Sequence, residues 1–494
     1  MILSLLWVPA VGAVATFLLP QRAVRAVALF VALMGTALAA WIYCQFDPEA
    51  ASLQMTWGAP WIRSLNVHFA LGVDGISFPL VLLTKAMVPV AVMASWRETR
   101  YVRFYMALYL LLDCAMTGTF LATDLFLFYI FWELMLIPMF LLVGVWGGKE
   151  RIYASLKFVL YTFAGSVLML VAIFYLMNRH KALLGDYTAE MAAFNSFKFS
   201  GEKVVLGLSP EELVFLAFTI AFLIKVPLFP FHTWLPDAHV QAPTGGSILL
   251  AAVLLKMGVY GLLRIAIPFC PNAFNRFSPA LAVLALVGAL YGAWVALRQS
   301  DMKRMVAYSS VSHLGLVVLG ICALNTQGVS GALLQSVNHG ISTGALFFLV
   351  GVLYERRHSR NFSDYGGLAS VMPMYSVFLV VAACASMGVP GLNGFVGEFM
   401  ILSGVFVRNH VWGGVGVLAV VFGAAYTLVL LKKVLFGPIT CAENSVIVDL
   451  DRREMVVLLG LSGAMLILGV WPGLILKTIS GSLPGYLLGV AGLR

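Results

Sequence analysis

Apolar residues fill this chain in long windows that are separated by short polar connections. A window of about twenty apolar residues is long enough for a helix to cross the hydrocarbon core of a bilayer, and the sequence has roughly fourteen such windows. They lie near residues 1–20, 24–45, 72–95, 103–121, 123–147, 155–177, 212–232, 244–268, 278–298, 303–324, 328–353, 372–407, 411–436 and 455–477. The pattern predicts an all-α polytopic membrane protein.

Lysine and arginine gather in alternate connections between these windows. The connections that follow windows one, three, five, nine, eleven and thirteen are basic, through Arg22, Arg25, Arg97, Arg100, Arg103, Lys149, Arg151, Arg298, Lys303, Arg304, Arg356, Arg357, Arg360, Lys432, Lys433, Arg452 and Arg453. The other connections are mostly poor in basic residues; 178–211, with Arg179, Lys181, Lys198 and Lys203, is the exception. Because cytoplasmic loops carry an excess of basic residues, odd-numbered windows are predicted to end in the cytoplasm, and both chain ends, including Arg494, to face outside.

Two windows are interrupted by proline or glycine. One contains KVPLFPFHTWLP, which starts at Lys225, and the other contains MGVPGLNGFVGEF, which starts at Met387. Proline removes a backbone donor and clashes one turn back, so it breaks an apolar helix. We expect two discontinuous helices, the seventh and the twelfth. Broken segments at corresponding places in two halves of a chain favour inverted repeats around an ion path.

Composition supports the membrane assignment and excludes several other classes. Hydrophobic residues make up 61% of the 494 residues and charged residues 11%, whereas a soluble domain has about 25% charged residues. The net charge of +9 lies in short loops and does not indicate nucleic-acid binding. Six scattered cysteines include no CxxC pair, and no dinucleotide or phosphate motif is present. We therefore expect neither a cofactor nor a metal in this chain.

Ionisable residues inside the apolar windows are the candidate functional residues. Each charge there costs about 2.5–3.5 kcal/mol on insertion scales, so it is usually functional. The candidates are Glu133, Lys225, Lys256, His313, His339 and Glu398. Most lie near the midpoints of their windows, which predicts a row of titratable groups parallel to the membrane plane. Asp113 is a weaker candidate because it lies nearer a polar stretch, and Asp74, Asp124 and Asp237 are interpreted as caps at window ends.

Such a row of lysine, histidine and glutamate can carry protons. A buried lysine stays charged beside a glutamate and can release its proton when it moves away. Histidine titrates near neutral pH and relays protons through its two ring nitrogens. Static roles are the alternative: Glu133 and Lys225 could form a fixed ion pair between helices, and the two histidines could simply bond to neighbouring carbonyl groups.

Several long stretches carry a family resemblance. They are GVDGIS from Gly72, FWELMLIPMFLLVGVWG from Phe131, KVPLFPFHTWLPDAHVQAPTGGSILLAAVLLKMGVYGLLR from Lys225, DMKRMVAYSSVSHLGLVVLG from Asp301, SVNHGISTGALFFLVG from Ser336 and GVPGLNGFVGEFMILSG from Gly388. Together they resemble the antiporter-like membrane subunits of proton-pumping NADH:quinone oxidoreductase, respiratory complex I, of the subunit M or chain 4 type.

The resemblance implies an organisation for the chain. It implies N-terminal helices in 1–102, a first antiporter-like repeat in 103–268, a second inverted repeat in 269–436 and a last helix in 437–494. Each repeat would hold five helices. Gln241 stands where many relatives have glutamate, at what we expect to be a loop position.

The resemblance also implies roles for the six candidates. Glu133 and Lys225 resemble the coupled acid–lysine pair of the family, and Lys256 resembles its central relay lysine. His313 and His339 would continue the hydrophilic axis to Glu398, the exit-side residue. Glutamate at that position favours the subunit M type.

The expected function is proton translocation driven by quinone reduction in neighbouring subunits of a bacterial inner membrane complex. NAD, FMN, iron–sulfur clusters and quinone would belong to those partners, which include sister antiporter-like subunits. Three alternatives remain at this stage: a subunit of a multi-chain cation/proton antiporter of the Mrp type, a membrane-bound hydrogenase subunit, and a static membrane scaffold.

Overall fold

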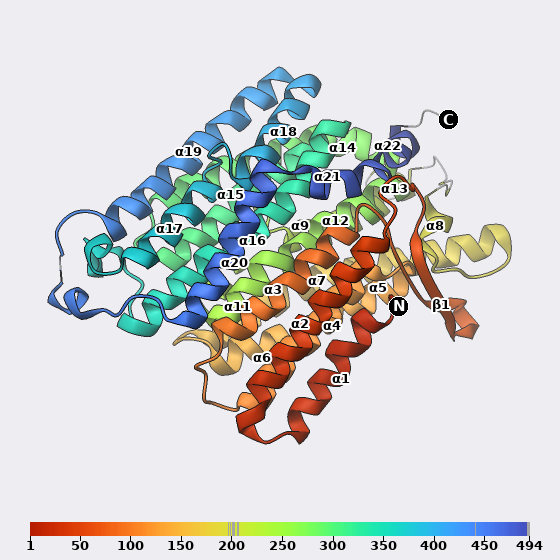
Figure 1. Cartoon of the computed structure of the whole chain (residues 1–494). Coiled ribbons are helices and arrows are strands. Elements are labelled where there is room, and N and C mark those ends of the chain that lie inside the picture. Colours follow the sequence, from red (N-terminus) through yellow and green to blue (C-terminus); the bar gives the residue numbers. More distant parts are fainter. Residues whose placement is uncertain (196, 198, 200–202, 205–206, 440, 492–494) are drawn as a thin grey trace.

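The structure is a computed structural model that describes residues 1–195, 197, 199, 203–204, 207–439 and 441–491. Long helices run side by side through one bundle (Figure 1). The first half contains α1 (Ser4–Leu18), α2 (Gln21–Gln45), β1 (Gln54–Ile62), η1 (Arg63–Leu65), β2 (Val67–Val73), α3 (Phe78–Ala94), α4 (Val102–Leu121), α5 (Leu125–Leu134), α6 (Leu136–Trp146), α7 (Arg151–Leu184), α8 (Met191–Phe194), α9 (Pro210–Lys225), α10 (Trp234–Gln241), α11 (Thr244–Leu249), η2 (Leu250–Leu254), α12 (Leu255–Gly261), η3 (Leu262–Ala266) and α13 (Ile267–Phe269).

The second half continues the bundle with longer helices. It contains α14 (Pro271–Leu297), α15 (Met302–Cys322), α16 (Thr326–Arg357), η4 (Phe362–Asp364), η5 (Leu368–Ser370), α17 (Pro373–Ser386), α18 (Asn393–Arg408), α19 (His410–Leu435), η6 (Ala442–Val446), α20 (Arg452–Val470), α21 (Gly473–Ser480) and α22 (Leu483–Ala491). Ten helical stretches among the described residues are long and apolar enough to cross a membrane. The expected count of fourteen stays a prediction.

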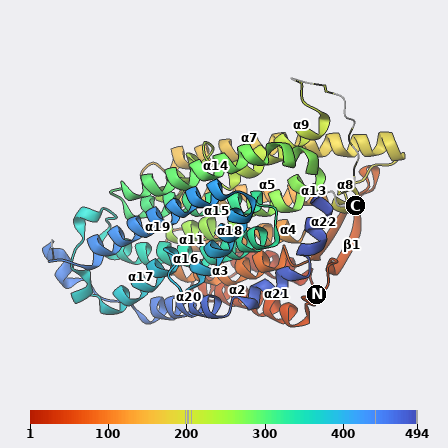
Figure 2. The same ribbon diagram turned by 90° about the horizontal axis from the view of Figure 1, so that it is seen from above.

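Burial separates the central helices from the peripheral ones. The apolar window of α16 is 100% buried, whereas those of α2 and α20 are 33% buried. Seen from above, α7 and α14 lie along one edge, α20 and α2 lie along the opposite edge, and α16 and α11 lie between them (Figure 2). The exposed apolar side chains of the edge helices are suited to contact lipid, and the buried helices can hold charged groups away from lipid.

The two discontinuous helices predicted from the sequence are confirmed. The first breaks between α9 and α10, over 226–233, where two prolines follow Lys225. The second breaks between α17 and α18, over 387–392. Gly388 and Gly391 have φ values of +76° and +90° in this break, a backbone region that only glycine enters readily. The breaks therefore arise from local sequence, as the prolines and glycines predicted.

The stretch 244–269 connects the two faces of the bundle and changes helix type along its length. Its π-helical segments η2 and η3 flank the α-helical turns of α12, which carries Lys256. Wide π turns inside α-helices occur frequently at functional sites. This segment is almost wholly buried, and the candidate site lies around it.

Several boundaries differ from the sequence expectation. A hairpin of β1 and β2 occupies the connection after the second helix, where no strand was predicted. The last window was predicted over 455–477, but α20 ends at Val470, just before Pro472, and α21 begins after it. Gln241 is the last residue of α10 rather than a loop residue. Lys198 and Arg494 lie outside the described residues.

Candidate functional site

Lys256 and His339 form the centre of the candidate site. Lys256 Nζ lies 2.7 Å from His339 Nδ1 and donates to the Ala251 carbonyl oxygen at 2.6 Å. Both side chains are buried, at 0% and 2% exposure. The lysine comes from α12 and the histidine from the central helix α16, so the contact joins two elements that are distant in sequence. A buried Lys–His contact can pass a proton between two groups that each exist charged or neutral.

His313 and Glu398 continue from this centre toward α18 and α19. The ring centroids of His313 and His339 are 5.6 Å apart. His313 Nδ1 lies 3.0 Å from Glu398 Oε1, and its Nε2 lies 3.0 Å from the Tyr426 hydroxyl. Gln335 Nε2 donates to the same Glu398 oxygen at 3.3 Å. The structure therefore brings four of the six predicted residues, Lys256, His339, His313 and Glu398, into one buried row.

The other two predicted residues, Glu133 and Lys225, stand apart from this row. Lys225 Nζ is buried without a hydrogen-bond partner among the described residues and lies 5.1 Å from the ring centre of Trp132. Glu133 is only partly buried, and its Oε1 is also unpartnered in the described part of the chain. No ion pair joins them within the described ranges. The fixed ion pair that the sequence allowed is therefore not formed in this arrangement.

Close backbone packing separates Lys225 from Lys256. A Cβ on Gly258 would lie 2.5 Å from the Phe222 carbonyl oxygen and 3.0 Å from the Val226 nitrogen. The glycine therefore lets α9 and α12 approach until their backbones touch. No hydrogen bond between the two lysines is formed in the described residues, so a proton needs movement or water to pass between them.

A buried ion pair that sequence analysis did not propose lies between α3 and α4. Lys85 Nζ donates to Asp113 Oδ1 at 2.8 Å and to the Leu5 carbonyl oxygen at 2.8 Å. Both side chains are 1% exposed. The Leu5 carbonyl is free because Pro9, four residues later, has no N–H to donate to it. The sequence carries a signal for this pair, since Lys85 lies near the midpoint of its window and Asp113 is the weaker candidate named above.

Two further buried ionisable residues, His239 and Lys303, were not among the predicted candidates. His239 is 0% exposed, has neither ring nitrogen bonded within the described residues and stacks on Phe347. Lys303 is buried and donates to the Ala242 carbonyl oxygen. Both lie in segments that the sequence predicts to be a helix end or a loop. A charge there is a weaker indication of function than a charge at the centre of an apolar window.

The aspartates interpreted as caps have different roles. Asp124 caps α5 by accepting from the backbone N–H groups of Phe126 and Leu127, as predicted. Asp74 accepts from backbone N–H groups ahead of α3, but it also pairs with Arg264. The prediction for Asp237 is wrong, because its carboxylate pairs with Lys157 and Arg304 and caps no helix.

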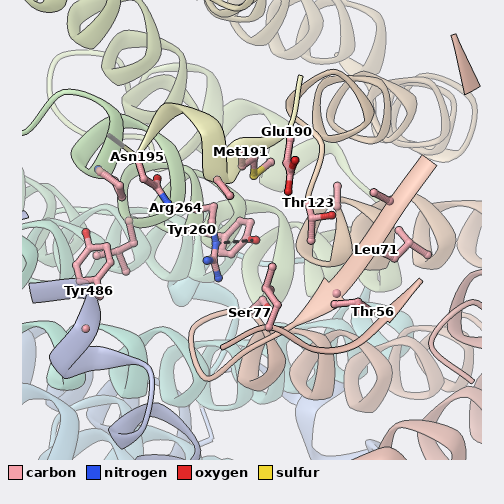
Figure 3. A pocket seen from close by; sticks show the side chains of 18 of the residues that line it. Thr56, Leu71, Ser77, Thr123, Glu190, Met191, Asn195, Tyr260, Arg264 and Tyr486 are labelled. Atoms are coloured by element: carbon pink, nitrogen blue, oxygen red, sulfur yellow. Dashed lines mark hydrogen bonds between the residues drawn. The ribbon is translucent and has the colours of Figure 1, made fainter. Parts of the chain in front are cut away.

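Hollows lie at both ends of the stretch 244–269. One, of about 950 Å³, is lined near Thr244 by Glu98, Lys303, Glu355 and Arg360. The other, of about 520 Å³, lies at the opposite end beside the β hairpin (Figure 3). Tyr260 and Arg264 line this second hollow, and Lys256 lies between the two. In the described ranges, no group of three or more His, Cys, Asp or Glu side chains is placed to hold a metal ion.

Comparisons with known proteins agree with this architecture. The family model described as "NADH:quinone oxidoreductase/Mrp antiporter, TM" matches residues 122–425. The chain is 44% identical to NADH-quinone oxidoreductase subunit M of Rhodobacter capsulatus, over 88% of this chain and 85% of the relative. A chain of respiratory complex I from Thermus thermophilus, solved with bound NADH, superposes with a TM-score of 0.88, 32% identity and coverage of 99% and 100%.

A chain of the Mrp complex from a Dietzia species shares the fold alone. Its TM-score is 0.82, but the identity is 21%, and the match covers 100% of this chain and 55% of that chain. The family description covers both NADH:quinone oxidoreductases and Mrp antiporters. The higher sequence identities to the oxidoreductase chains favour the oxidoreductase. With a buried row of charges inside a multi-pass membrane fold, and with relatives this similar over most of its length, the chain belongs to the subunit M family of NADH-quinone oxidoreductases.

Proposed function

We propose that this chain translocates protons along the row of Lys256, His339, His313 and Glu398, with Glu133 and Lys225 as the switch that precedes it. The chain is a membrane subunit of an NADH-quinone oxidoreductase, and quinone reduction in neighbouring subunits supplies the free energy. The chain itself performs no electron transfer. NAD, FMN, iron–sulfur clusters and quinone belong to its partners, which include sister antiporter-like subunits.

This proposal rests on the series of buried side-chain contacts that runs from Lys256 Nζ to Glu398 Oε1. His339 Nε2 has no partner among the described residues, and the His339 ring meets the His313 ring edge to face, with centroids 5.6 Å apart. We expect one water molecule on this nitrogen, because a buried polar atom without a protein partner usually binds ordered water. Both ring nitrogens of His313 are already bonded, to Glu398 and Tyr426, so a proton passes from His339 to His313 only when the His313 ring gives up its contact with Tyr426.

Lys225 supplies the control step in this proposal. In the described arrangement it contacts aromatic rings and no carboxylate, at 5.1 Å from Trp132 and 5.6 Å from Phe158. A second arrangement, in which Lys225 pairs with Glu133, would favour its charged form. Alternation between the two would make Lys225 take up and release a proton. Moving one charge against 100 mV requires about 2.3 kcal/mol, which the neighbouring subunits must provide.

The proposal includes an orientation in the bacterial inner membrane. The hollow near Thr244 is bordered by the connections that carry Arg97, Lys149, Lys303 and Arg360, and we place this face in the cytoplasm. The β hairpin and both chain ends would then face the periplasm. The two broken helices support the division into inverted repeats at 103–268 and 269–436, with 1–102 and 437–494 outside them.

Replacing Lys256 with glutamine tests the function directly. The variant keeps a hydrogen-bonding side chain of similar length but cannot carry the proton, so we expect proton translocation to fall several-fold in the assembled complex. Acidification of proteoliposomes during NADH oxidation measures it, after a native gel has shown assembly. Proton translocation at the parent rate would contradict the proposed row.

Tyr426 gives a second prediction, because its hydroxyl fixes the histidine tautomer. When Glu398 is ionised, His313 Nδ1–H donates to it, and Nε2 accepts from the tyrosine hydroxyl. Tyr426→Phe removes a hydrogen bond worth about 1 kcal/mol, so we expect proton translocation to slow about fivefold. The pH dependence of the rate should shift as well. A loss of rate without any such shift would indicate a packing role.

A further inference from the structure

The hollow beside the β hairpin lies on the side of the membrane to which the proposed proton row delivers protons. Its lining is mostly apolar, but it includes the polar side chains of Thr56, Ser77, Thr123, Glu190, Tyr260 and Arg264 (Figure 3). Under the proposed orientation it faces the periplasm. A proton that reached Lys256 from this hollow would return across half the membrane without driving any reaction. The structure must therefore block this route.

One helix face leads from the row to the hollow. Lys256, Tyr260 and Arg264 follow one another at intervals of four residues, so they lie near the same face of the helix. Arg264 is about 12 Å beyond Lys256 at the α-helical rise. Tyr260 is 2% exposed, and its ring meets Phe120 edge to face at 5.4 Å. An aromatic contact and a cation thus stand between the hollow and Lys256.

The cation is held in a fixed position. The Arg264 guanidinium donates to both carboxylate oxygens of Asp74 at 2.5 Å, and its Nε donates to the Tyr260 hydroxyl at 3.2 Å. Asp74 also accepts from the backbone N–H groups of Ile76 and Ser77, at 3.1 and 3.0 Å. These contacts tie η3 to the segment before α3. Arginine keeps its proton at any physiological pH, so it cannot act as a relay.

We propose that Arg264, held by Asp74 and Tyr260, is an electrostatic seal that keeps protons of the hairpin-side hollow from reaching Lys256. A fixed guanidinium between the hollow and Lys256 repels protons and other cations, as an arginine does in other membrane pores. The carboxylate of Asp74 orients the cation and compensates for its burial. Arg264 is thus a positioning and barrier residue, not a relay residue. This inference rests on the proposed function of the row.

The double substitution Asp74→Asn with Arg264→Gln tests the seal without leaving one buried charge unpaired. The whole complex is purified, reconstituted into liposomes and given an external acid pulse in the absence of NADH. We expect the internal pH to fall several-fold faster than with the parent complex. During NADH oxidation, the same vesicles should reach a smaller pH gradient at the same rate of NADH consumption.

Two matched variants identify the route of the leak. Arg264→Lys keeps the positive charge and should leave passive permeability close to that of the parent. Adding Lys256→Gln to the leaking double variant should restore low permeability, because the leak then has no acceptor in the row. If the double variant fails to assemble, Asp74→Leu with Arg264→Met replaces it, because this pair likewise leaves no buried charge unpaired.

The outcomes separate the seal from the function on which it rests. Parent-like passive permeability in the assembled double variant would overturn the seal alone. A leak that persists after Lys256→Gln has been added would also overturn it, because the protons would not be using the row. Proton pumping at the parent rate by Lys256→Gln alone would overturn the proposed function, and the seal with it.

Discussion

Glu398→Gln should abolish proton translocation by the assembled complex. The glutamine keeps the shape and one carbonyl oxygen of the side chain, but it removes the only carboxylate in the row formed by Lys256, His339 and His313. Glu398 is 4% exposed and meets His313 at 3.0 Å, so within the described contacts its loss leaves the histidine without a proton acceptor. No other group in the row can take over the exit step. We therefore expect a larger loss of proton translocation from Glu398→Gln than from Lys256→Gln.

Acidification of reconstituted vesicles during NADH oxidation measures this loss. Quinone reduction should fall with it if the two processes are tightly coupled, and an uncoupler then distinguishes a blocked exit from a damaged complex. Lys225→Ala is the companion variant, since it removes the switch and leaves the exit intact. If assembled Glu398→Gln and Lys225→Ala complexes both pump at the parent rate, the charges are structural and the static scaffold is the better description.

Single substitutions at Lys85 or Asp113 should destabilise the subunit far more than the double substitution. Lys85→Met leaves Asp113 as an uncompensated carboxylate at 1% exposure, and Asp113→Asn leaves the lysine unpaired in the same way. Breaking a buried pair costs about 3–5 kcal/mol, whereas replacing both partners by groups of similar volume is often neutral. We expect little assembled complex from either single variant and near-parent amounts from Lys85→Met with Asp113→Leu.

The amount of complex on a native gel and its thermal transition test this prediction. Thr36→Val is a matched control, because Thr36 bonds to the backbone carbonyl of Lys85 and carries no charge. The pair lies apart from the row between α12 and α18, so proton translocation per assembled double-variant complex should equal that of the parent. A reduced yield of the double variant similar to that of the single variants would contradict a simple charge-pair role.

Static roles were the alternative for the two histidines and for the pair of Glu133 and Lys225, and the structure bears on the two alternatives differently. The sequence allowed His313 and His339 to bond only to neighbouring carbonyl groups, but their side-chain partners in the structure include Glu398, Tyr426 and Lys256. Glu133 and Lys225, in contrast, form no ion pair in the described arrangement. Local sequence could not distinguish these cases, since each depends on which helix supplies the opposing side chain.

The sequence by itself determined the membrane class, the helix breaks and the identities of the four ionisable residues in the buried row. A bilayer admits helices only where about twenty apolar residues follow one another, so composition and window length predict the spans. The breaks after Lys225 and around Gly391 depend on proline geometry and on positive φ, which are local properties. For these features no contact with a distant segment is needed.

Only the tertiary structure decided which charges meet. Lys256 and His339 are separated by 83 residues, and His313 and Glu398 by 85, so no periodicity in one helix could pair them. Lys85 bonds to Leu5 because a proline in another helix frees that carbonyl, and Arg264 reaches Asp74 across 190 residues. An ion pair forms where packing brings its partners within a few ångströms, and helix packing is set by all the side chains of the bundle together.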